Sequence, residues 1–261
     1  MQTDFDKLAD YYRSYHGECG EQHRLQRDQA HTIEFITSMH LLLKHLPKGC
    51  SVLDCCAAEG AYAFPLAKEG YRVTAGDLIK EHVEILQRKN SNSLLENIYH
   101  GNVLDMSEFS NESFGSVLCM GALYHLMEQQ EREKCVAECL RVLKKDGVFA
   151  FAYLNRNAQY IADFNANPSA IETQKVILET GKHGMFYAMD FNEPQELADK
   201  FPLTKITDAG VDGLIYPLKS ILNEITPDEF SAYMEYHIST CEQPSIIGHS
   251  IHGLWIGRKQ S

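Results

Sequence analysis

Short apolar runs and segments of helical spacing alternate along most of the chain. Two of the runs end in an acid, at Asp54 and at Asp77, and the segments between runs place an apolar residue every three or four positions. The first pattern is typical of buried strands and the second of amphipathic helices. The predicted strands cover residues 51–55, 71–76, 96–100, 115–120, 147–154, 203–212 and 250–258. The predicted helices cover residues 4–14, 31–46, 60–69, 80–90, 128–143, 158–165, 170–180, 193–200 and 226–240.

Strands that alternate with helices indicate an α/β fold with a mostly parallel sheet. We expect a three-layer αβα sandwich, in which helices cover both faces of a seven-stranded sheet. The alternation stops at Asn155, and residues 155–190 show helices but no clear strand. We expect these residues to form a helical cap, inserted after the fifth strand as a lid. The chain, residues 1–261, is predicted to form one domain, with residues 1–30 as an N-terminal cover segment.

The turn after the first strand indicates the kind of ligand. It reads Cys56-Ala57-Ala58-Glu59-Gly60, whereas a dinucleotide-binding turn has three glycines. Because Glu59 would repel a pyrophosphate, the turn favours a cofactor without phosphate, S-adenosylmethionine (AdoMet). Asp54 would then face the methionine ammonium group, and Asp77 would accept hydrogen bonds from the ribose. A nicotinamide cofactor, or a βαβ unit without any ligand, remains an alternative at this point.

Four segments of the chain resemble the class I AdoMet-dependent methyltransferases. They cover residues 52–60, 101–106, 113–126 and 140–151, in the order that the family has them. The resemblance spans about residues 30–155 and is closest to small bacterial methyltransferases with a methyltransferase-domain core. It implies AdoMet as the cofactor and S-adenosylhomocysteine as the product. The cofactor-binding residues that it implies are Asp54, Cys56, Ala57, Ala58, Gly60, Asp77, Leu78, Asn102, Val103, Cys119 and Met120.

Some positions depart from the pattern of this family. Cys56 and Ala58 stand where the family usually has glycines, and each adds a Cβ close to the cofactor. Asn102 stands in place of an acid, although its amide oxygen can still accept a hydrogen bond from the adenine amino group. These departures lower the expected affinity for AdoMet. They also motivate a second hypothesis, an AdoMet-binding protein with a non-catalytic or regulatory role.

Methyl transfer from a sulfonium needs an aligned acceptor and a dry site, and it needs no metal ion. A general base is required only if the acceptor carries a proton that must leave. The predicted catalytic residues are Tyr124 and His125, after the fourth strand; alternatively, His125 caps or packs the following helix. The substrate candidates are these two residues with Tyr15 and Arg24 of the cover segment. Arg24 would bind a carboxylate or phosphate on the acceptor, unless it is a solvated surface charge.

Composition narrows the possible partners. The formal net charge of −12 argues against a surface for nucleic acid or anionic membranes, which attract clustered Lys and Arg. The N-terminus lacks an apolar signal segment, so we expect a cytoplasmic protein whose eight cysteines are reduced. Cys135 and Cys139 share one helix face, and their apolar neighbours indicate core packing rather than a metal site. His249 and His252 would point to opposite faces of a strand, and this argues against zinc.

The sequence thus predicts an enzyme that transfers a methyl group from AdoMet to a small-molecule acceptor. A tRNA methyltransferase is the alternative within the enzyme class, but the sequence shows no cluster of Lys and Arg. A nicotinamide-dependent reductase is a further alternative, against which the single glycine and Glu59 argue. We expect a monomer or a homodimer.

Overall fold

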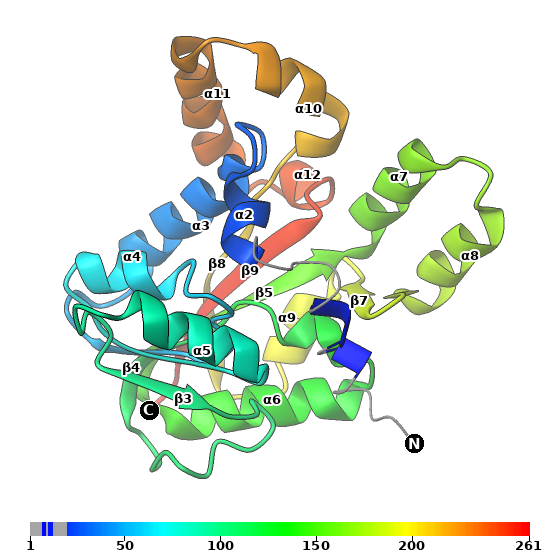
Figure 1. Cartoon of the computed structure of the whole chain (residues 1–261). Helices are drawn as coiled ribbons and strands as arrows, with labels where there is room; N and C mark the ends of the chain where they lie inside the picture. Colours follow the sequence, from blue (N-terminus) through cyan, green and yellow to red (C-terminus); the bar gives the residue numbers. More distant parts are fainter. Residues whose placement is uncertain (1–6, 9, 13–19) are drawn as a thin grey trace.

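A nine-stranded mixed sheet forms the centre of the described part of the molecule (Figure 1). The computed structural model describes residues 7, 8, 10–12 and 20–261. Strands β3, β2, β1, β4 and β5 lie parallel in this order; β9 pairs antiparallel with β5, and β8 pairs antiparallel with β9. The strands are β1 (Ser51–Asp54), β2 (Arg72–Asp77), β3 (Asn97–His100), β4 (Phe114–Cys119), β5 (Leu143–Asn155), β6 (Lys182–His183), β7 (Phe186–Met189), β8 (Leu203–Gly210) and β9 (His252–Lys259).

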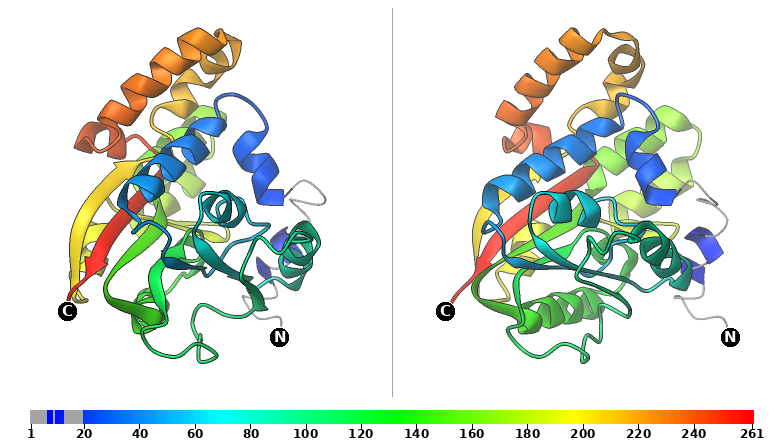
Figure 2. Two further views of the ribbon diagram at one scale, coloured as in Figure 1. Left: turned by 90° about the vertical axis from the view of Figure 1, so that its left-hand side faces the viewer. Right: turned by 60° about the vertical axis from the view of Figure 1, so that its left-hand side comes forward.

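Helices cover both faces of this sheet, because successive residues of its central strands are buried on opposite sides. Val52 packs with the helices of one face and Leu53 with those of the other. Helices α3, α4 and α5 lie on the first face, and α6 and α9 lie on the second (Figure 2). The helices are α2 (Gly20–Gln26), α3 (Thr32–His45), α4 (Ala63–Lys68), α5 (Lys80–Lys89), α6 (Gln129–Val142), α7 (Arg156–Ala166), α8 (Ile171–Thr180), α9 (Glu193–Ala198), α10 (Ile215–Glu224), α11 (Pro227–Thr240) and α12 (Pro244–Ile247), with a 3-10 turn η1 (Leu123–His125).

Two helical pairs extend the molecule beyond the carboxyl ends of the strands. Helices α7 and α8 follow β5 and pack on each other, and α10 and α11 stand between β8 and β9 in the chain (Figure 1). The hairpin of β6 and β7 follows α8, and its strand β7 adds to the end of β5 through Leu154 and Ala188. Among the described residues, no helix is long and apolar enough to cross a membrane.

The three-layer fold and the mostly parallel sheet are confirmed, and each of the seven predicted strands is present. The expectation that residues 155–190 hold no strand was wrong, because β6 and β7 lie there. These strands are only two and four residues long, too short for a recognisable period. Helix α4 begins at Ala63 rather than at residue 60, since Gly60 has a φ of +87° and is not helical.

The prediction also missed three helices. Helix α2 lies in the cover segment, where a helix was predicted only at residues 4–14, and α10 and α12 were not predicted. The apolar residues of α10, Ile215 and Leu222, pack against α3 and α11 rather than against the sheet. Of the predicted helix at residues 4–14, the described residues 7, 8 and 10–12 are helical, and the remainder lies outside the described part.

Candidate active site

A cavity of about 550 Å³ opens at the carboxyl ends of β1, β2, β3 and β4. Parallel α/β sheets bind their ligands at this edge. The N-terminal segment, the loops after these four strands and the turn between β6 and β7 supply its walls. The lining residues include Lys7, Leu8, Tyr12, Cys56, Ala58, Asp77, Leu78, His82, Asn102, Val103, Met120, Tyr124, His125, Met127, Glu131 and Met185.

The loop between β1 and α4 keeps a turn that usually requires glycine. Ala58 has a φ of +44°, in the left-handed region, where a non-glycine residue costs about 1–3 kcal/mol. Its N–H donates to the Asp77 carboxylate at 2.8 Å, and the N–H of Ala57 donates to the carbonyl of Gly76 at the same distance. These two bonds fasten the loop to the end of β2, so that alanine adopts the conformation in which the family has glycine.

Asp77 lies at the end of β2 and lines the cavity. One carboxylate oxygen accepts from the N–H of Ile79 at 2.8 Å and lies 3.1 Å from Nδ1 of His82, and the other accepts from Ala58. A carboxylate offers about four acceptor positions. One position remains beside the cavity, and His82 can yield another to a ribose hydroxyl. The site therefore fits the sugar of AdoMet.

Asp54 lies beneath the loop and is 1 % exposed. Neither of its carboxylate oxygens has a hydrogen-bond partner among the described residues. Burial, together with the neighbouring Asp77, raises the pKa of Asp54 to about 8. A buried carboxyl group without partners fits a ligand that brings a positive charge, and the ammonium group of AdoMet is such a charge.

The other predicted cofactor residues fall into two groups. Leu78, Asn102, Val103, Met120 and Cys56 line the cavity, as the resemblance implies. The Asn102 side-chain oxygen accepts from the N–H of Leu104 at 2.9 Å, which leaves one lone pair for an adenine amino group. Ala57, Gly60, Cys119 and Asp54 are buried and are not among the lining residues; the first three shape the loops, and Asp54 lies beneath them.

Cysteine thiols gather beneath the same loops. Cys135 and Cys139 are fully buried in the core, as their spacing on α6 predicts. Cys119 lies with its sulfur 3.7 Å from that of Cys135, and the sulfurs of Cys55, Cys119 and Cys139 are all within 4.8 Å of one another. Hydrogen bonding with neighbouring thiols, above all Cys119, and then burial raise the pKa of Cys55 and Cys135. Protonated thiols of this kind pack as small apolar groups.

His125 is directed into the cavity and held from both sides. Its Nδ1 lies 3.1 Å from the carbonyl oxygen of Met185, and its Nε2 lies 2.7 Å from the hydroxyl of Tyr12. A carbonyl can only accept, so Nδ1 carries the proton, and the lone pair of Nε2 accepts from the hydroxyl of Tyr12. Helix α6 begins after Glu128 without a side-chain cap, so the imidazole does not cap it.

Aromatic rings surround this imidazole. The ring centroid of Phe186 lies 4.9 Å from that of His125, and the ring of Tyr124 lies equally close. Tyr124 also packs beside Leu154 and Ala158 under the cap, so its ring is part of a small core cluster. The walls near His125 are therefore apolar and flat on several sides.

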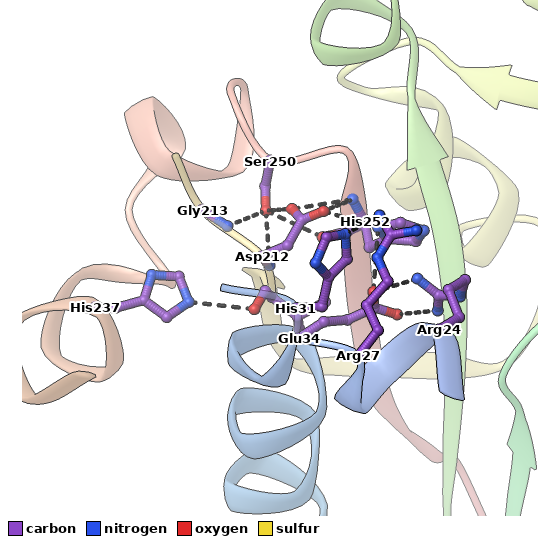
Figure 3. Close-up of polar contacts among 10 residues, drawn as sticks. Arg24, Arg27, His31, Glu34, Asp212, Gly213, His237, Ser250 and His252 are labelled. Carbon is purple, nitrogen blue, oxygen red and sulfur yellow. Dashed lines mark hydrogen bonds and ion pairs between the residues drawn. The ribbon is translucent and has the colours of Figure 1, made fainter. Parts of the chain in front are cut away.

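The two candidates from the cover segment have different outcomes. Tyr15 lies outside the described residues. Arg24 does not line the cavity; its guanidinium donates to both carboxylate oxygens of Glu34 at 2.7 Å (Figure 3). Glu34 in turn approaches His252, which is bonded to Asp212 at 2.8 Å. Arg24 is thus one member of an internal network rather than a free charge.

Sequence reasoning did not find several residues of the cavity. His82 stands five positions after Asp77 on α5, and this spacing to an acid was its only local signal. Met127 and Glu131 line the cavity near η1 and α6, and the sequence around them shows only a helix start. Their place in the site depends on how α6 crosses the end of β4.

Comparisons with known proteins agree with this geometry. Residues 53–151 match the family model described as "Methyltransferase domain". A ubiquinone biosynthesis O-methyltransferase from Methylocella silvestris is 24% identical over 221 residues, which are 81% of this chain and 83% of that protein. A protein of the same name from Vibrio atlanticus is 28% identical over 170 residues, 64% of this chain and 68% of that one.

Solved structures share the fold at low sequence identity. An AdoMet-dependent methyltransferase from Methanosarcina mazei has a TM-score of 0.60 and 17% identity, over 84% of this chain and 97% of that one. A protein from Pyrococcus horikoshii OT3 has a TM-score of 0.62 and 16% identity, over 96% and 99% of the two chains. The strand order, the ligand edge of the sheet and the matched domain agree with the resemblance of the motifs: residues 53–151 match a methyltransferase domain, on a fold that the chain shares with these solved structures.

Proposed function

We propose that this enzyme methylates a hydroxyl group of a small, flat acceptor and that His125 is the general base. The chain transfers a methyl group from AdoMet to a small molecule and releases S-adenosylhomocysteine. The observation that carries the finer proposal is the orientation of His125, which lines the cavity with its protonated Nδ1 bonded to Met185 and with the lone pair of Nε2 directed to the hydroxyl of Tyr12, another lining residue. That lone pair suits an acceptor whose proton must leave.

The walls of the cavity support an aromatic acceptor. Tyr12 and Tyr124 line the cavity beside His125, and flat apolar groups pack well on such rings; Phe186, which is not a lining residue, packs against the imidazole. The names of the relatives from Methylocella silvestris and Vibrio atlanticus describe O-methyltransferases, which agrees with a hydroxyl acceptor. The enclosed volume and the net charge of −12 favour a small molecule over tRNA.

Each part of the cavity has a role in this proposal. Asp77 would hold the ribose, Asp54 would face the ammonium group, and Asn102 with Val103 would line the adenine. Bound AdoMet supplies the methyl group and a neutral thioether as leaving group. His125 would be the final acceptor of the proton that leaves the acceptor hydroxyl. The proposed reaction uses no metal ion, and we propose a monomer or homodimer as the working form.

Replacement of His125 tests the base. With catechol as the probe acceptor, we expect His125→Gln to lower kcat by about 10²–10⁴-fold, the usual contribution of general-base catalysis. The affinity for S-adenosylhomocysteine, measured by calorimetry, should stay within about twofold, because His125 lies at the acceptor end.

His183→Gln is the matched control. His183 lies on β6, two residues from Met185, and pairs with Asp163 at 3.2 Å outside the cavity lining. It should leave kcat unchanged. Wild-type turnover in the His125→Gln enzyme would remove the base from the mechanism, whereas failure of the wild-type protein to bind S-adenosylhomocysteine would contradict methyl transfer from AdoMet altogether.

A further inference from the structure

The N-terminal segment places a phenol directly on the proposed base. The hydroxyl of Tyr12 lies 2.7 Å from Nε2 of His125, and the Tyr12 ring stands edge-on to that imidazole, with 5.5 Å between the centroids. Tyr12 is separated from His125 by 113 positions and lines the same cavity. This contact joins the cover segment to the acceptor end of the site.

The protonation state of His125 decides which atom donates and which accepts in this contact. Because Nδ1 donates to the carbonyl of Met185, Nε2 is an acceptor with a single lone pair. The hydroxyl of Tyr12 donates its proton to that lone pair. An acceptor molecule therefore cannot deliver its own proton to Nε2 while Tyr12 is in place. The proton must pass through Tyr12, or Tyr12 must leave.

We propose that Tyr12 is a second catalytic residue, which relays the acceptor proton to His125. A tyrosine hydroxyl donates one proton and accepts through its lone pairs, so it can bridge an acceptor hydroxyl and an imidazole. As the acceptor oxygen forms its bond to the methyl carbon, the bond from that carbon to sulfur breaks, and the electron pair stays on sulfur. The acceptor proton moves to the Tyr12 oxygen, and the Tyr12 proton moves to Nε2. The products are the methyl ether, the thioether and an imidazolium.

The surroundings of Tyr12 favour a relay over displacement. The Tyr12 ring also stands edge-on to His82 at 5.5 Å, and His82 is held by Asp77 at 3.1 Å. The adjacent Tyr11 packs edge-on against Phe186 at 5.6 Å. Two consecutive aromatic residues thus anchor the segment to α5 and to β7. Tyr12 stands between the proposed ribose acid and the proposed base, as part of the wall.

The relay places one member of the proton path on the N-terminal segment, which contributes Lys7, Leu8 and Tyr12 to the lining of the cavity. The inference rests on the proposed function, in which a hydroxyl acceptor loses its proton to His125.

The variant Tyr12→Phe removes the hydroxyl and keeps the ring. It therefore distinguishes a proton relay through Tyr12 from a mechanism in which the acceptor displaces Tyr12 from Nε2 of His125. If Tyr12 relays the proton, kcat for catechol should fall by about 10²-fold. Catechol should also bind more weakly to the complex with S-adenosylhomocysteine, since it loses an acceptor for its proton. If Tyr12 only occupies the acceptor position, the variant frees Nε2, so that catechol binds more tightly and kcat is maintained or rises.

Tyr11→Phe is the matched control, since it removes a hydroxyl from the same segment away from Nε2, and it should behave as the wild type. The double variant Tyr12→Phe/His125→Gln should be no slower than His125→Gln alone, because both residues act in one proton path. If Tyr12→Phe keeps the wild-type kcat while His125→Gln is impaired, the relay is overturned and the proposed base stands. Unimpaired His125→Gln, or no binding of catechol to the wild-type complex, would overturn the proposed function and the relay with it.

Discussion

At the residue scale, Asp54 is a buried acid beneath the proposed cofactor site. Its pKa of about 8, raised by burial and then by Asp77, means that the carboxyl group is protonated in the free protein at neutral pH. An acid whose pKa rises on folding stabilises the folded state below its unfolded pKa of 3.8, and that contribution is lost as the pH rises toward 8. The protein therefore keeps at this position a group that is costly to ionise without a ligand.

Binding of AdoMet at pH 7 should release up to about one proton from Asp54, because the ammonium group stabilises the carboxylate and lowers its pKa. Calorimetric titrations in phosphate and in Tris should then give different apparent enthalpies. Asp54→Asn should remove the difference and weaken binding by about 10–100-fold, the usual loss for a charge-assisted hydrogen bond. Equal enthalpies in the two buffers for the wild type would contradict the ammonium contact.

At the element scale, the short hairpin of β6 and β7 orients the imidazole. Met185 stands in the turn between these strands, and its carbonyl fixes Nδ1 of His125. The hairpin itself depends on the end of α8, where Gly181 has a φ of +71° and donates its N–H to the carbonyl of Ile177. The Gly181 carbonyl then accepts from Ala188 of β7 at 2.7 Å. One helix end thus supports the residue that holds the proposed base.

Gly181→Ala should disturb this hairpin more than Gly184→Ala. Both positions have a positive φ, which costs an L residue about 1–2 kcal/mol. A Cβ on Gly181 would lie 2.4 Å from the Ala188 oxygen, whereas a Cβ on Gly184 meets no atom within 4 Å. We expect urea unfolding to show a loss of about 1 kcal/mol for Gly184→Ala, and hydrogen exchange at β7 to increase only in Gly181→Ala. Equal exchange in both variants would argue against the clash.

At the scale of the whole molecule, one ionic network joins segments far apart in the chain. Arg24 of α2 and Glu34 of α3 meet His252 of β9 and Asp212 of the loop after β8 (Figure 3). Burial would raise the pKa of Glu34, but Arg24 and then His252 outweigh it and hold that pKa at about 2. Burial would lower the pKa of His252, but Glu34 and Asp212 raise it. The network thereby fastens the cover segment to the last strand.

The stabilisation that this network gives the folded state should decrease at low pH and also at high pH. The contribution of Glu34, about 3 kcal/mol for a shift from 4.5 to about 2, is present above pH 4.5 and is lost as the pH falls toward 2. His252 contributes below its unfolded pKa of 6.5, and this part is lost as the pH rises through its folded pKa. The two contributions are present together between about pH 4.5 and 6.5.

We expect Glu34→Gln to lower the free energy of unfolding by about 3 kcal/mol at pH 6, with a difference that shrinks as the pH falls to 2. Urea denaturation over this pH range measures it. Glu242→Gln is the matched control, because Glu242 forms an exposed pair with Lys44 at 3.3 Å, and such pairs contribute less than about 1 kcal/mol. A pH-independent effect of Glu34→Gln would show that packing, rather than charge, accounts for its role.

The sequence by itself determined the sheet, its layers and the cofactor edge. The period of apolar residues follows from backbone geometry, and an acid at the end of a parallel strand must lie at the ligand edge, as Asp54 and Asp77 do. Only the tertiary structure decided that Tyr12 reaches His125, that Arg24 pairs inside a network, and that β7 extends the sheet. These contacts join residues that no local spacing relates, because they depend on how the cover segment and the cap pack against the finished sheet.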